Sequence, residues 1–106
     1  MKYYCVAEFD VTDRGWVPEY VRGVTGLVER YGGRYLARTP KSEVLEGDAK
    51  VPQIFLIIEW PSREAALAFY ESEEYAPYRK SRLEGSAGRL LLVAGEDVTG
   101  TARMAD

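Results

Sequence analysis

The hydrophobic positions of the chain are densest between Gln53 and Ser62, where the sequence reads QIFLIIEWPS. Odd and even positions are both apolar, whereas a strand with one face in water alternates apolar and polar residues. This pattern therefore predicts a strand that needs a cover on each face. One carboxylate, Glu59, stands near the end of the strand, where a charge is costly unless it is paired, hydrated or used.

The rest of the pattern predicts strands and helices in a simple order. Aromatic and β-branched residues indicate a first strand over 2–11, and apolar residues at helical spacing indicate a helix from about Val17 to Tyr31. Further strands are expected over 34–39, with a continuation at 43–46 after Pro40, over the stretch described above and over 89–94. Further helices are expected over about 62–71 and 74–83, with a turn at 47–50 and a loop at 85–88.

Two glycines, Gly23 and Gly26, interrupt the first predicted helix. Each costs about 1 kcal/mol relative to alanine inside a helix, so each is expected to have a reason. Close packing of the helix on the sheet is one such reason, and the floor of a ligand pocket is the other.

The order β-α-β-β-α-β is that of the ferredoxin-like α+β fold, a four-stranded antiparallel sheet with its helices on one face. The helices leave the second apolar face of the sheet bare, and a large exposed apolar patch is typical of an interface. We therefore expect a homodimer with sheet against sheet and a barrel-like core, a dimeric α/β barrel. The alternative cover is the polar C-terminal tail, 96–106, whose large apolar residues are Val98 and Met104. That tail could instead be mobile or reach over the partner, so the domain itself is expected over 1–95.

Charge and length exclude several classes of function. A chain of 106 residues is expected to form one domain, and its 14 basic and 17 acidic residues give a net charge of -3, which argues against a nucleic-acid partner. Charge returns as early as Glu8, which argues against a signal peptide, and no apolar run is long enough to span a membrane. We expect a cytoplasmic protein with no membrane or nucleic-acid partner.

The histidine and cysteine counts limit the chemistry further. The chain has no histidine, which removes the commonest general base and the commonest metal ligand. Its single cysteine, Cys5, excludes an intrachain disulfide and is expected to pack as an inert thiol. No glycine-rich phosphate loop of the required spacing is present. We therefore expect no metal site and no cofactor.

Several segments, GGRYLART, EVLEGD, LIIEWPSREAALAFYESEEY and RLLLVAG, resemble in order and spacing the bacterial domain-of-unknown-function family 1330. The resemblance covers about Lys2 to Gly95. It implies a dimeric α/β-barrel fold and does not imply a reaction. Distant members of the same barrel include antibiotic-biosynthesis monooxygenases, muconolactone isomerase-like enzymes, polyketide cyclases and haem-degrading proteins. The haem degraders rely on a histidine that this chain lacks.

Glu59, Arg38 and Glu8 are the candidate catalytic residues. A tight hairpin turn at 47–50 would place Arg38 opposite Glu59 on one sheet face, although a bulge near Pro40 would break this register. In the paired arrangement Glu59 would help to orient the substrate and would be a weak base. Glu8, without an obvious cation, is then the better proton acceptor. The alternative role of Arg38 and Glu59 is a structural ion pair at the rim of the barrel. The alternative for Glu8 is a position at an exposed strand end.

The candidate substrate-binding residues are aromatic or cationic. Phenol rings can pack while their hydroxyls orient a carbonyl, and an arginine can hold an anionic group through its fork. The residues are Tyr4, Phe55, Tyr70, Tyr75, Tyr78 and Arg82. Their alternatives are core packing for the aromatic rings and surface solvation for Arg82.

Two functions remain in view. The first is an enzyme that binds a small, partly apolar, carbonyl-bearing metabolite and catalyses cofactor-independent proton transfer, as an isomerase or cyclase does, or oxygenation as a monooxygenase. The second is a non-catalytic dimeric binding or structural module.

Overall fold

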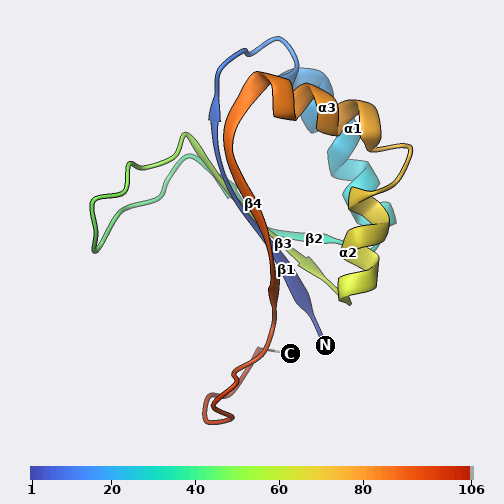
Figure 1. The fold of residues 1–106 in the computed structure, drawn as a ribbon. Helices are drawn as coiled ribbons and strands as arrows, with labels where there is room; N and C mark the ends of the chain where they lie inside the picture. Colours follow the sequence, from blue (N-terminus) through green and yellow to red (C-terminus); the bar gives the residue numbers. More distant parts are fainter. Residues whose placement is uncertain (106) are drawn as a thin grey trace.

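A computed structural model of the chain describes residues 1–105. In chain order the elements are β1 (Tyr3–Val11), α1 (Val17–Arg30), β2 (Arg34–Thr39), β3 (Ile54–Trp60), α2 (Arg63–Tyr70), α3 (Ala76–Gly85) and β4 (Ser86–Ala94). Figure 1 shows a single twisted sheet with all three helices on one side of it. The predicted order of elements and the three predicted helices are confirmed.

The four strands form one sheet in the order β2-β3-β1-β4, and every neighbouring pair is antiparallel. This is the ferredoxin-like α+β arrangement that the pattern predicts. β1 and β3 occupy the centre, which explains why β3 is apolar on both faces. β2 and β4 form the edges.

Two local predictions are wrong. Residues 43–46 do not continue β2, because 40–53 form one long, mostly exposed loop that projects from the sheet on the side away from the helices (Figure 1). No loop spans 85–88 either, since α3 runs to Gly85 and β4 begins at Ser86. The Gly85 carbonyl ends the helix by accepting hydrogen bonds from the backbone N–H groups of Thr12 and Asp13, and Val11 pairs directly with Ser86.

The core lies between the sheet and the helices. Its buried residues are Val24, Leu27 and Val28 of α1, Ile58 and Trp60 of β3, Ala66 and Phe69 of α2, and Tyr75. Each large apolar side chain contributes about 1.5–3 kcal/mol when buried. The Cys5 thiol accepts a hydrogen bond from the Trp60 indole at 3.3 Å, and burial raises the pKa of Cys5. The thiol therefore packs as the sequence predicts.

The two helix glycines differ in surroundings. A Cβ at Gly23 would lie 2.3 Å from the Tyr78 hydroxyl oxygen, so this glycine allows the tyrosine ring to pack directly on α1. A Cβ at Gly26 would meet no atom within 4 Å. Packing therefore explains Gly23, and the structure provides no packing reason for Gly26.

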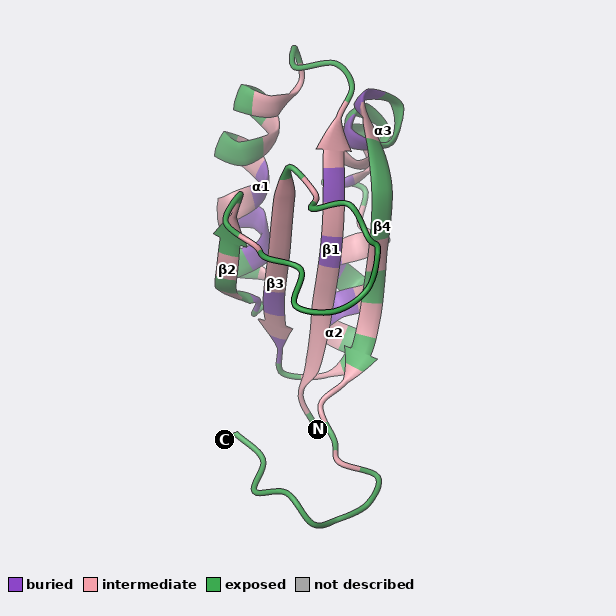
Figure 2. Ribbon diagram, turned by 90° about the vertical axis from the view of Figure 1, so that its left-hand side faces the viewer, coloured by how far each residue is buried: buried purple, intermediate pink, exposed green. Residues whose placement is uncertain are grey.

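The opposite face of the sheet, which we call the open face, carries no helix (Figure 2). Its apolar side chains are half-buried or exposed, and they are Tyr4, Val6, Phe55, Ile57, Leu91 and Val93. The tail does not lie over this face, because residues 96–105 extend beyond the end of the strands in both Figure 1 and Figure 2. The loop over 40–53 projects outward on this side of the sheet, and neither a helix nor the tail covers the open face in one copy of the chain (Figure 1 and Figure 2).

Candidate functional site

A β-bulge in β2 decides which side chains reach the helix side of the sheet. Arg34 pairs with Glu59 and Tyr35 with Ile58, but the next pair is Ala37 with Ile57, so Leu36 is an extra residue. Beyond this bulge the side-chain alternation changes phase. As a result, Arg38 faces the helices, together with Tyr35.

The predicted pairing of Arg38 with Glu59 is therefore wrong, since Arg38 pairs with Leu56 instead. The prediction assumed a tight turn at 47–50, whereas the long loop over 40–53 leaves the register free. Glu59 lies on the open face and forms an ion pair with Lys2, whose Nζ lies 2.9 Å from its Oε1.

Glu8 also lies on the open face, and it does have a cation. Its Oε2 accepts a hydrogen bond from Arg89 Nε at 3.2 Å, which corrects the expectation of an unpaired carboxylate. Tyr4 and Phe55 share this face, because Tyr4 pairs with Glu59 and Phe55 with Glu8. The sheet thus separates four of the nine predicted site residues from the other five.

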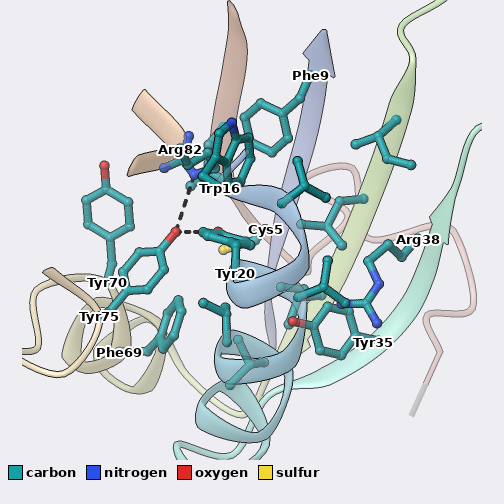
Figure 3. Close-up of a pocket in the computed structure, with 18 of the residues that line it drawn as sticks. Cys5, Phe9, Trp16, Tyr20, Tyr35, Arg38, Phe69, Tyr70, Tyr75 and Arg82 are labelled. Atoms are coloured by element: carbon teal, nitrogen blue, oxygen red, sulfur yellow. Dashed lines mark hydrogen bonds between the residues drawn. The ribbon is translucent and has the colours of Figure 1, made fainter. Parts of the chain in front are cut away.

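The remaining predicted residues lie on the helix side. Arg38, Tyr70, Tyr75 and Arg82 all line a cavity of about 120 Å³ between the sheet and the helices (Figure 3). Tyr78 does not line it and packs instead against Gly23. The other lining residues are mostly apolar and comprise Cys5, Phe9, Val11, Trp16, Val17, Tyr20, Val21, Val24, Val28, Tyr35, Ile54, Leu56, Ile58, Phe69 and Leu90.

Three polar side chains form a hydrogen-bonded cluster on one wall of this cavity. The hydroxyl oxygens of Tyr20 and Tyr75 lie 2.6 Å apart, and Arg82 Nε donates to the Tyr75 hydroxyl at 3.3 Å (Figure 3). Tyr20 comes from α1 and Arg82 from α3, while Tyr75 directly precedes α3. We call Tyr20, Tyr75 and Arg82 the polar cluster.

Arg82 is the buried charged residue of the described chain, with 4% of its surface exposed. Its guanidinium carbon lies 4.9 Å from the centre of the Phe9 ring. Burial acts to lower the pKa of Arg82, but the hydroxyls of Tyr75 and Tyr20 raise it by more, so the guanidinium stays charged. No carboxylate pairs with it among residues 1–105.

Tyr20 lies in the first predicted helix and is a site residue that the sequence did not single out as a candidate. Burial, followed by the neighbouring Tyr75 hydroxyl, raises the pKa of Tyr20 far above its ordinary value. Its hydroxyl therefore stays protonated and can donate a hydrogen bond. The available signal was a tyrosine on a buried helix face, since a buried phenol hydroxyl needs a polar partner.

A second polar feature borders the cavity at β2. The Arg38 guanidinium lies 4.5 Å from the centre of the Tyr35 ring, and its Nη1 donates to Thr25 Oγ1 at 2.9 Å. Unlike Arg82, Arg38 is exposed. The cavity thus has one buried cation and one cation at its rim.

The cavity wall offers hydrogen-bond donors and positive charge, and its lining contains neither a carboxylate nor an imidazole. Within residues 1–105 no three His, Cys, Asp or Glu side chains come together as a metal site would require. No helix in the same range is long and apolar enough to cross a membrane. The arrangement can hold an anionic oxygen at the polar cluster and enclose an apolar body against the sheet.

The fold places the chain among the small ferredoxin-like α+β proteins. The chain belongs to the family described as domain of unknown function (DUF1330), which matches residues 2–96. No curated protein shows significant similarity to it.

Solved structures share the fold at low sequence identity. A protein of unknown function from Rhodopseudomonas palustris is similar with a TM-score of 0.73 and 17% identity, covering 87% of this chain and 80% of that one. SnoaB, a cofactor-independent oxygenase from Streptomyces nogalater, is similar with a TM-score of 0.61 and 14% identity, covering 93% and 97%. A putative antibiotic biosynthesis monooxygenase from Nitrosomonas europaea has a TM-score of 0.51 and 14% identity, covering 93% and 94%.

Proposed function

We propose that the chain binds a small, partly apolar, carbonyl-bearing organic acid in the cavity, with the anionic oxygen of the ligand at the polar cluster. The observation that carries the proposal is Arg82, a buried cation without a carboxylate partner among the described residues. An uncompensated buried charge is costly, so proteins keep one chiefly where it serves a ligand. A ligand carboxylate or enolate would supply the missing negative charge.

The size of the cavity limits the apolar part of the ligand. An apolar cavity of about 150 Å³ is known to accept a benzene molecule, and this cavity measures about 120 Å³. It therefore suits one small ring or a short branched chain. A polycyclic ligand would require the helices to move away from the sheet.

The polar cluster favours chemistry on an enolate. Arg82 and the hydroxyl pair of Tyr20 and Tyr75 can donate hydrogen bonds, and such donors stabilise negative charge that develops on a carbonyl oxygen in a water-poor site. No carboxylate lines the cavity to take up the proton, so the ligand must be acidic enough to lose it to water. Cofactor-independent proton transfer is the reaction that this arrangement supports first. Oxygenation of the resulting enolate would take molecular oxygen as its co-substrate and oxidant, and one of the similar structures is a cofactor-independent oxygenase.

The binding step can be tested with benzoate as the probe, by calorimetry on the wild type and on Arg82→Gln. Loss of a charge-assisted hydrogen bond should weaken binding roughly tenfold or more. Lys80→Gln, which removes an exposed charge from the same helix, should bind benzoate as the wild type does. Equal affinity in the wild type and Arg82→Gln would show that the polar cluster does not hold the acid.

The catalytic step can be tested with phenylpyruvate in deuterated water, because exchange of its benzylic protons reports enolisation. The wild type should accelerate exchange above the uncatalysed rate, and Arg82→Gln should not. Binding without accelerated exchange would favour the non-catalytic binding module instead.

We propose further that two copies of the chain pair through their open faces. The central residue Ile57 is half-buried in one copy, and Leu91 and Val93 are exposed beside it. Ile57→Lys should place two charges in the contact and yield monomers by light scattering, while Arg63→Lys on the exposed surface of α2 should leave the mass unchanged. A wild-type mass of one subunit at micromolar concentration would contradict the pairing.

A further inference from the structure

Arg38 lines the cavity on the side opposite Arg82. Figure 3 shows the two guanidinium groups on different sides of the enclosed space, one reaching in from β2 and the other from α3. Arg38 lies over the Tyr35 ring of β2, and Arg82 lies over the Phe9 ring of β1. The two cations therefore mark two separate ends of one cavity.

The strand register indicates how far apart these ends are. β1 and β2 are separated by β3, which places them about 10 Å apart at the usual spacing of about 4.8 Å between strands. Phe9 pairs with Ile54 and Tyr35 with Ile58, which adds roughly 13 Å along the strands. The two components combine to about 16 Å between the backbone positions, and since both guanidinium groups reach from there toward the cavity, their own separation is smaller, on the order of 10–15 Å.

The two cations of the cavity lack carboxylate partners among the described residues although the chain is acidic overall. The chain has more carboxylates than cations, 17 against 14, yet no carboxylate is among the residues that line the cavity. The ion pairs of the described residues lie elsewhere and involve Lys2, Arg30 and Arg89. Both ends of the cavity thus carry a positive charge without an ionic partner from the described chain.

We propose that the ligand of this cavity carries two acidic groups at opposite ends of its apolar body, the inner one held by the polar cluster and the outer one by Arg38. This inference rests on the proposed function, because it takes the inner contact at Arg82 as given. An aromatic ring with two carboxylates in para positions spans the gap once a charge-assisted hydrogen bond of about 2.8 Å is added at each end. Arg38 then determines specificity for diacids.

The test compares terephthalate with 4-methylbenzoate, two ring acids of similar shape of which only the first has a second charge. Calorimetry on the wild type at low salt should show terephthalate binding about fivefold more tightly, as expected for an exposed ion pair. In Arg38→Gln the ratio of the two dissociation constants should fall to about one, and Arg38→Lys should restore part of it. Arg34→Gln removes an arginine from the open face of the same strand and should keep the wild-type ratio.

The outcomes separate this inference from the proposal beneath it. A wild-type ratio near one, or a fivefold ratio that persists in Arg38→Gln, overturns the diacid inference, while loss of 4-methylbenzoate binding in Arg82→Gln would still support the inner site. Failure of both acids to bind at millimolar concentration overturns the two proposals together.

Discussion

Tyr75→Phe removes one hydroxyl that holds the polar cluster together. The hydroxyl bonds to Tyr20 at 2.6 Å and accepts from Arg82 Nε at 3.3 Å, and only 2% of the Tyr75 surface is exposed. Losing the bond to Tyr20 costs about 1 kcal/mol, and leaving a buried guanidinium N–H unsatisfied costs about 2 kcal/mol more. The expected destabilisation is therefore about 3 kcal/mol.

Thermal unfolding by circular dichroism at one fixed protein concentration measures this loss. For a domain of this size 1 kcal/mol corresponds to about 4–8 °C, so Tyr75→Phe should melt roughly 12–24 °C below the wild type. Tyr20→Phe loses the tyrosine pair but leaves Arg82 bonded to Tyr75, so it should lose about a third of that. Tyr70→Phe is the matched control, because the Tyr70 hydroxyl makes no hydrogen bond to the described residues.

The order of the three melting temperatures tests how much each hydrogen bond of the polar cluster contributes to stability. If Tyr75→Phe melts with Tyr70→Phe, the hydroxyl of Tyr75 does not satisfy the buried guanidinium, and the cluster is not the organised anion site described above. If Tyr20→Phe is the most unstable of the three, the hydrogen bond to Arg82 contributes less than the tyrosine pair.

Three further predictions test other parts of the structure. Glu59→Gln should lower the free energy of unfolding by about 1–3 kcal/mol in urea titrations, because the Glu59 side chain is only 16% exposed in one copy and the proposed pairing of open faces would cover it further; an unchanged stability would show that the ion pair with Lys2 contributes nothing. Because folding raises the pKa of Tyr20, the tyrosine loses its proton at lower pH in the unfolded chain than in the folded one. The contribution of Tyr20 to stability should therefore be complete below about pH 10 and be lost as the pH rises above it. Melting temperatures of the wild type and Tyr20→Phe should therefore diverge less at high pH than at neutral pH. Gly26→Ala should raise the melting temperature by about 4 °C, whereas Gly23→Ala should gain less or lose stability because the new methyl group meets a tyrosine ring.

The fold was predictable because its signals are local. The doubly apolar stretch at Ile54–Trp60 and the helical spacing of α1 each identify an element without knowledge of any other element. The order of elements then leaves few arrangements of the sheet. Residues 43–46 were misassigned because an apolar pair next to a glycine resembles a strand end, and only the lack of a partner strand shows otherwise.

The site was less predictable because its geometry depends on register. Tyr70, Tyr75 and Arg82 line the cavity, since α2, α3 and the residue that precedes α3 all lie on one face of the sheet. Arg38 also reaches it, but through a bulge at Leu36, whereas the sequence suggested a possible bulge near Pro40. Glu8 and Glu59 were plausible bases by residue type alone, and their cations come from Arg89 and Lys2, which are remote or unobvious in the sequence.

The extra residue Leu36 also affects how relatives of this chain must be compared. A chain that lacked one residue at this point could keep the same amino acids in β2 and yet present its arginine to the opposite side of the sheet. An alignment with its gap placed a single position away would equate a cavity residue with an open-face residue. Conservation in this strand is therefore meaningful only between chains that share the bulge. Insertion or deletion of a single residue here would change the charge that the strand presents to the cavity.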